Sequence, residues 1–151
     1  MGPANDAAGG FTPTAVDLRD YVYFQEAGPA TRRVFATDVV AVDLTGFEPK
    51  QETEVRAFRT ADAVYTVLGG RAWVVTDEAE VTLEPLQSLM VPAGVPHAVR
   101  NDAPDPLILQ IVVSPPDDVP APPAGPAEPP GAGGREPRAS LLDRVRRTLG
   151  G

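Results

Sequence analysis

Short apolar runs separated by polar breaks dominate the chain from Asp17 to Ser114. The runs are rich in Val, Ile, Leu, Tyr and Phe, and Gly, Pro and Asp interrupt them at short intervals. Such spacing is typical of an all-β sandwich or barrel. The candidate strands are Val34–Thr37, Val39–Leu44, Val55–Phe58, Ala63–Leu68, Arg71–Thr76, Glu80–Leu83, Ser88–Val91, His97–Arg100 and Leu107–Val113.

Two dipeptides between these runs have the composition of tight turns. Gly69-Gly70 and Asp77-Glu78 separate neighbouring candidate strands, and glycine supplies the positive φ that two-residue hairpin loops require. The pattern predicts consecutive hairpins joined by short connections. The early segment Asp17–Phe24 fits a strand or a helical turn, and the sequence does not separate the two.

The composition changes after the last candidate strand. Nine of the 18 prolines lie within residues 115–137, with almost no large apolar side chain among them. Such a segment cannot offset its ordering entropy, so we expect a disordered linker. Residues 138–151 place Leu141, Leu142, Val145 and Leu149 on one face of a short amphipathic helix. The predicted organisation is a disordered N-terminus (1–14), a β-barrel (15–114), the linker and the helix.

Composition and charge limit the partners. The 151 residues carry a net charge of −8 and no cysteine, and acidity of this kind disfavours nucleic acid. No apolar run is long enough for a membrane span, so a membrane partner is not expected. The first 14 residues lack the basic and apolar parts of a secretory signal, which predicts a soluble, cytoplasmic protein.

One stretch carries a specific motif. Pro92-Ala-Gly-Val-Pro-His-Ala-Val-Arg-Asn101 has the pattern Pro-x-Gly-x-x-His-x-x-x-Asn. This pattern resembles the second conserved motif of the cupins, apart from that motif's leading glycine, whose place Leu86 takes. In that family a tight turn delivers the histidine into the mouth of a small barrel. The resemblance covers roughly Val34 to Ser114 and implies a cupin-type jelly-roll barrel.

The resemblance also implies a degenerate metal site. The first cupin motif supplies a His-x-His pair and a glutamate before a strand that ends in Gly. Counting back from Gly70, these slots fall on Arg56, Phe58 and Ala63. A transition-metal site needs about three or more His, Cys, Asp or Glu ligands, and an arginine repels a cation. We therefore expect no metal and no other cofactor.

Alternation along strands assigns the interior. If Arg56 and Phe58 occupy the inward slots, Ala63, Tyr65 and Val67 point inward with His97 and Val99. His97 is then either a structural residue bonded to Tyr65 or a general base and ligand donor. Arg56 either pairs with a nearby acid such as Glu54 or clamps an anion. Tyr65 and Phe58 serve as core or as ligand wall.

Three functions remain open at this point. The first is a metal-free barrel that binds a small organic ligand, with an organic anion as one option, through Arg56, Phe58, Tyr65 and His97. The second is a metal-independent enzyme of the isomerase or epimerase type, with His97 as base and Tyr65 as acid. The third is an interaction module in which residues 138–149 dock on a protein partner. A homodimer is expected because a small barrel leaves apolar strand surface that a partner can cover.

Overall fold

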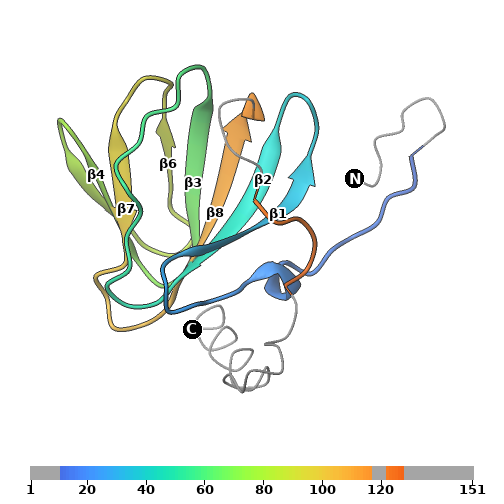
Figure 1. Cartoon of the computed structure of the whole chain (residues 1–151), viewed down its shortest axis with the longest axis horizontal. Helices are drawn as coiled ribbons and strands as arrows, with labels where there is room; N and C mark the ends of the chain where they lie inside the picture. The colour runs from blue at the N-terminus through green and yellow to red at the C-terminus, as the bar shows by residue number, and fades with distance from the viewer. Residues whose placement is uncertain (1–10, 117–121, 128–151) are drawn as a thin grey trace.

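A computed structural model describes residues 11–116 and 122–127. Eight strands follow one short 3-10 helix (Figure 1). In chain order the elements are η1 (Leu18–Tyr21), β1 (Ala30–Ala36), β2 (Ala41–Phe47), β3 (Asp62–Gly69), β4 (Ala72–Thr76), β5 (Glu80–Leu83), β6 (Ser88–Val91), β7 (His97–Arg100) and β8 (Leu107–Ser114). The predicted all-β fold is confirmed, and the ambiguous segment Asp17–Phe24 contains the helical turn.

The strands form two antiparallel sheets that enclose the core. One sheet has the order β1-β2-β8-β3-β6 and the other the order β5-β4-β7. The core cluster draws on both, with Leu109 and Val67 from the larger sheet and Val74, Leu83 and Val99 from the smaller. β8 lies between β2 and β3, although it is the last strand in sequence.

The inward positions of β3 follow the predicted alternation. Along Asp62–Gly69 every second residue is buried, including Ala63, Tyr65 and Val67. His97 and Val99 alternate in the same way on β7. The inward register of these strands was therefore read correctly from the sequence.

The motif residues build the turns at the ends of the strands. Gly94 has a φ of 87°, a left-handed conformation that favours glycine, and its N–H donates to the carbonyl of Phe58 at 2.7 Å. The Ala93 N–H donates to the Asp62 carboxylate at 3.0 Å. The Asn101 amide is fully buried and donates to the carbonyls of Phe47 and Asp105, at 3.2 and 2.9 Å. Asn101 therefore has a structural role.

Leu86 occupies the slot of the motif's leading glycine and keeps the backbone conformation that suits glycine. Its φ is 70°, and 82% of the residue is exposed. A left-handed conformation costs a residue with a Cβ roughly 1–2 kcal/mol. Leucine thus carries strain there without burying its side chain in return.

Two expectations about the elements were wrong. The expected strand Val55–Phe58 does not form, because this segment makes only an isolated antiparallel bridge between Arg56 and His97. The Gly69-Gly70 turn does not close a hairpin, since it carries the chain from β3 in one sheet to β4 in the other. Gly70 is needed there because a Cβ would lie 2.3 Å from the carbonyl oxygen of Pro106. The hairpin at Asp77-Glu78 is confirmed by the β4–β5 pairing.

Part of the predicted linker is in contact with the barrel. Residues 122–127 run beside β1, where Ala124 forms a parallel bridge with Arg33. The rest of the linker, beyond Pro116 and apart from this segment, lies outside the described residues, as does the helix expected within 138–151. Within the part that the structure describes, no helix has the length and apolar character needed to span a membrane.

Candidate functional site

Two facing strands bring Tyr65 and His97 together inside the barrel. Tyr65 lies in the middle of β3, and His97 opens β7 directly after the turn at Gly94. The Tyr65 hydroxyl and His97 Nε2 are 2.5 Å apart, and both residues are buried. Their rings meet edge to face at a centroid distance of 5.3 Å.

The hydrogen bonds assign the protons of this pair. His97 Nδ1 lies 3.0 Å from the carbonyl oxygen of Val95, and a carbonyl can only accept. Nδ1 therefore carries the proton of the neutral ring, which leaves Nε2 as the acceptor for the Tyr65 hydroxyl. Both nitrogens of His97 are satisfied within the protein.

Burial keeps both groups neutral. It lowers the pKa of His97, with a further lowering by the positive charge of Arg56 and a partial opposing effect of the Val95 carbonyl. It also raises the pKa of Tyr65, an effect that the charge and hydrogen bond of the nearby Arg56 guanidinium partly offset. At neutral pH the pair is a tyrosine donor on an uncharged imidazole.

Phe58 and Arg56 occupy the space around His97. The Phe58 ring is buried and meets the His97 ring edge to face at 5.8 Å. The Arg56 guanidinium carbon lies 5.1 Å from the centroid of the Phe58 ring, a cation–π distance. Main-chain hydrogen bonds in both directions fix Arg56 to His97, at 2.9 and 3.0 Å.

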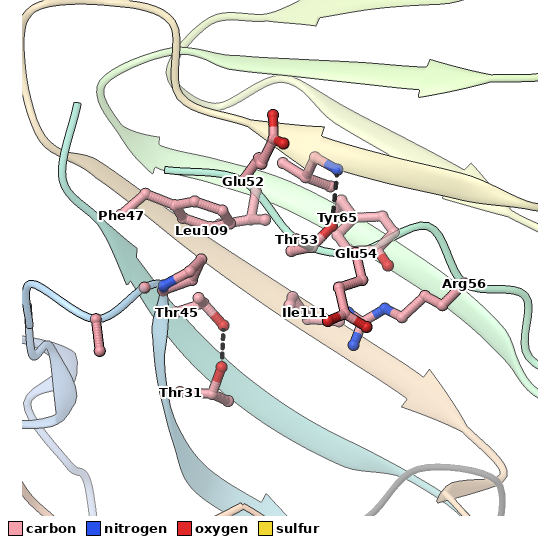
Figure 2. Close-up of a pocket in the computed structure, with 14 residues that line it drawn as sticks. Thr31, Thr45, Phe47, Glu52, Thr53, Glu54, Arg56, Tyr65, Leu109 and Ile111 are labelled. Atoms are coloured by element: carbon pink, nitrogen blue, oxygen red, sulfur yellow. Dashed lines mark hydrogen bonds between the residues drawn. The ribbon is translucent and has the colours of Figure 1, made fainter. Parts of the chain in front are cut away.

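A cavity of about 380 Å³ opens on the other side of Tyr65 (Figure 2). Apolar side chains of both sheets and several hydroxyl groups form its walls, and the loop before β1 and the segment before Phe58 form its mouth. The lining residues are Ala27, Gly28, Pro29, Thr31, Thr45, Phe47, Glu52, Thr53, Glu54, Arg56, Tyr65, Val99, Leu109 and Ile111. A volume near the lower end of the range for small-molecule pockets, about 300–1,000 Å³, suits a compact ligand.

Three charged side chains stand at the mouth. Glu52 pairs with Arg100 at 3.2 Å, and both side chains are exposed. Glu54 and Arg56 extend from the same segment along one side of the cavity (Figure 2). The mouth thus presents one guanidinium, one carboxylate that is paired with Arg100, and one carboxylate beside Arg56.

The structure brings the four predicted site residues together but gives them unequal access. Arg56 and Tyr65 line the cavity, whereas Phe58 and His97 lie behind them and are not part of its wall. Among the described residues, no group of three His, Cys, Asp or Glu side chains could hold a metal ion. The expectation that the protein carries no metal stays a prediction.

Sequence reasoning missed the hydroxyl groups of the cavity. Thr31 and Thr45 bond each other across β1 and β2, with 2.7 Å between their oxygens. Thr53 accepts from the N–H of Val99 at 3.0 Å. Thr31 and Thr45 both lie outside the predicted strands, because β1 begins before Val34 and β2 continues past Leu44, so the alternation rule was not applied to them.

A buried ion pair was also missed. Arg33 on β1 meets Asp43 on β2 through two hydrogen bonds, at 2.9 and 3.2 Å. The side chain of Arg33 is 12% exposed and that of Asp43 is 5% exposed. An aspartate in the middle of the apolar candidate strand Val39–Leu44 was the available signal.

Comparison with known proteins identifies similar sequences and folds. Residues 44–114 match the family model described as "Cupin domain". A crystal structure of a protein from Thermus thermophilus is 32% identical, has a TM-score of 0.64 and is matched over 96% of its length and 67% of this chain. Among curated proteins, none matches the chain significantly.

Two further crystal structures share the fold at lower identity. A conserved Klebsiella pneumoniae protein with a double-stranded β-helix domain is 21% identical, with a TM-score of 0.66 over 71% of this chain and 94% of that chain. A cupin superfamily protein from Desulfitobacterium hafniense is 20% identical, with a TM-score of 0.59 over 68% of this chain and 92% of that chain. At this identity the two structures show the fold alone.

Proposed function

The chain belongs to the cupin superfamily, and we propose that it is a metal-independent, cytoplasmic binding protein that holds a small organic anion in its barrel. The observation that carries this proposal is the position of Arg56 and Tyr65 on the wall of the 380 Å³ cavity. A guanidinium recognises a carboxylate through paired, charge-assisted hydrogen bonds. The aliphatic wall of Val99, Leu109 and Ile111 would take the apolar part of the ligand.

The side chains at the mouth of the cavity limit which anions can bind. Glu54 lies on the same segment as Arg56, so a second negative charge on the ligand would meet a carboxylate. The hydroxyl groups of Thr31 and Thr45 can donate to, or accept from, a polar group deeper in the cavity. These features favour a monocarboxylate with a short apolar body and one further polar group.

His97 acts in this proposal through Tyr65. The imidazole accepts the Tyr65 proton at Nε2, which directs the lone pairs of the hydroxyl oxygen away from the histidine. His97 is then a positioning residue, and Tyr65 and Arg56 are the groups that touch the ligand.

A panel of monocarboxylic and dicarboxylic acids of about four to eight carbons tests the proposal by ligand-observed NMR and calorimetry. We expect a monocarboxylate to bind, and Arg56→Ala to weaken its binding at least about tenfold, the loss of one charged hydrogen bond. Arg71→Ala is the matched control, because Arg71 is half-exposed beside Glu84 and does not line the cavity. Equal affinity of both variants, or no binding at millimolar concentration, would contradict the proposal.

One observation favours a second candidate, an isomerase or epimerase. The direct contact of 2.5 Å between Tyr65 and His97 provides a route by which His97 could act as the base: the Tyr65 oxygen takes a proton from the substrate carbon while its own hydroxyl proton passes to Nε2. Incubation with a panel of aldoses, ketoses and their phosphates in D₂O should then produce deuterium incorporation at carbon. The same protein carrying Tyr65→Phe should produce none.

A further inference from the structure

An extended segment from beyond the barrel lies along the outer edge of β1, away from the cavity. Residues 122–127, coloured red-orange in Figure 1, pass from beside β1 to beside the blue helix η1. β1 is an edge strand of the five-stranded sheet, with β2 on its other side. An open edge of this kind presents unpaired N–H and C=O groups that can pair with another strand.

Main-chain groups make the first set of contacts. The Arg33 N–H donates to the carbonyl of Pro123 at 2.8 Å, and the Gly125 N–H donates to the carbonyl of Arg33 at 3.2 Å. This is the pattern of a parallel β-bridge centred on Ala124. At the far end the Ala127 N–H donates to the carbonyl of Asp20 at 2.9 Å. The segment therefore joins β1 to η1.

The Arg32 side chain makes the second set. Its Nε donates to the carbonyl of Gly125 at 3.1 Å, and its Nη2 donates to the carbonyls of Ala124 and Pro126, at 3.1 and 2.9 Å. One guanidinium thus holds three successive carbonyls. Its several donors in a rigid fork suit it to this task, and a lysine could not reproduce the geometry.

The composition of the segment fits an edge position. Pro122, Pro123 and Pro126 carry no N–H, so the segment as a whole offers few main-chain donors to a further strand. Gly125 has a φ of 86°, and a Cβ at this position would meet nothing within 4 Å. Its requirement for glycine is therefore one of backbone conformation and not of space.

We propose that the outer edge of β1, together with Arg32, is a docking site for an extended peptide that contains proline and glycine and is recognised through its main chain, and that residues 122–127 of the same chain are its occupant. β8 ends one strand away from β1, on the far side of β2, a separation of about 10 Å. The residues between Pro116 and Pro122 can span roughly 20 Å when extended. Short covalent connection raises the effective concentration of the occupant to about the millimolar range.

Competition with a peptide in trans tests this site in the full chain. The probe is a fluorescein-labelled peptide with the sequence of residues 121–128, measured by fluorescence polarisation. Gly125→Val should release the native segment, because a β-branched residue disfavours positive φ, while Arg32 and β1 stay intact. We expect this variant to bind the peptide at least about tenfold more tightly than the unaltered protein, in which the site is occupied.

Two further substitutions in the Gly125→Val background identify the recognition group. Arg32→Ala should reduce peptide affinity at least about tenfold. Arg19→Ala is the matched control, since Arg19 bonds Asp17 and is half-exposed on the neighbouring segment, and it should leave the affinity unchanged. In the unaltered protein, the amides of Gly125 and Ala127 should exchange slowly, and Arg32→Ala should accelerate their exchange about tenfold or more.

Three results would overturn the proposal. The first is equal peptide binding by all variants, or no binding by Gly125→Val. The second is fast exchange at Gly125 and Ala127 in the unaltered protein. The third is a nuclear Overhauser contact between Arg32 and Gly125 that appears only between differently labelled chains, which would make the occupant a second copy.

Discussion

The interior of the barrel has two halves on either side of Tyr65, and they are filled in opposite ways. On one side the rings of Phe58 and His97 pack edge to face, and every polar atom of the imidazole has a partner. On the other side the space between Phe47, Leu109 and Thr45 stays open as a cavity. Packed side chains therefore fill only one half of the interior. A small barrel can be closely packed at one end and still offer a binding volume at the other.

The largest loss of stability is expected in the packed half, which contains Phe58 and His97. Phe58→Ala should lower the free energy of unfolding by about 3–5 kcal/mol, because it removes a buried ring and leaves a void beside His97. Phe35→Ala serves as the control, since Phe35 is 38% exposed and should cost much less. Denaturant unfolding measures both. Similar losses for the two variants would mean that the Phe58 half is no better packed than the surface.

A smaller loss of stability is expected at Tyr65, which lies between the two halves of the interior. Tyr65→Phe removes the donor to His97 Nε2 and leaves a buried acceptor without a partner, at a cost of about 1–3 kcal/mol. Tyr23→Phe is the control, because Tyr23 is only partly buried. The chain has a single histidine, so its ¹⁵N resonances report the tautomer without ambiguity. A spectrum with the proton on Nε2 would contradict the assigned hydrogen bonds.

The pH dependence of stability tests whether His97 is buried in its neutral form. Burial lowers the pKa of His97 below its usual 6.5, so between that value and the folded-state pKa the unfolded chain binds the additional proton. Stability should therefore fall as pH decreases below about 6.5, with a slope of at most about 1.4 kcal/mol per pH unit from this residue. His97→Gln should lack this component. An NMR titration that placed the pKa of His97 above 6.5 would reverse the sign.

The smallest loss of stability is expected in the half that contains the cavity. Thr45→Val breaks the hydroxyl pair with Thr31, yet we expect a loss of no more than about 1 kcal/mol because the remaining hydroxyl faces the cavity and can be solvated. Thermal unfolding of this variant beside Tyr65→Phe compares the two halves directly. A larger loss for Thr45→Val would show that the hydroxyl pair is a structural element and not part of a binding surface.

The homodimer stays a prediction that the single chain does not address. Met90 on the edge strand β6 is 59% exposed, and a partner could cover it. Light scattering at micromolar concentration should report twice the chain mass of 15.9 kDa. Met90→Lys should shift that mass toward the monomer if β6 lies in the interface, and an unchanged dimer would place the interface elsewhere.

The sequence predicted the strands well where packing follows a simple rule. Alternation of apolar residues located β3 to β8 to within a few residues and placed Tyr65 and His97 on the inward face, because one buried face requires a period of two. The motif Pro92–Asn101 located the turn that presents His97. The same reasoning failed for Val55–Phe58, where only Phe58 is buried, Val55 is exposed, and the segment pairs at a single bridge.

The cavity and the docked segment could not be predicted by the same rule. The cavity depends on residues from β1, β2, β3, β7 and β8 and on two loops, whose approach is set by the three-dimensional packing of the sheets. Residues 122–127 contain nothing apolar and periodic, so composition alone favoured disorder. Their contacts are made by main-chain groups and by Arg32, and a hydropathy pattern predicts neither kind of contact.

The central place of β8 has a consequence for how the protein is made. Until Leu107–Ser114 leaves the ribosome, the larger sheet exists only as two separate pairs, β1 with β2 and β3 with β6. Each pair exposes the edge that β8 will later occupy, and contacts between such distant parts of a chain form slowly. A nascent chain that pauses before Leu107 would carry two unpaired edges at once, the state most open to misassembly and to capture by chaperones.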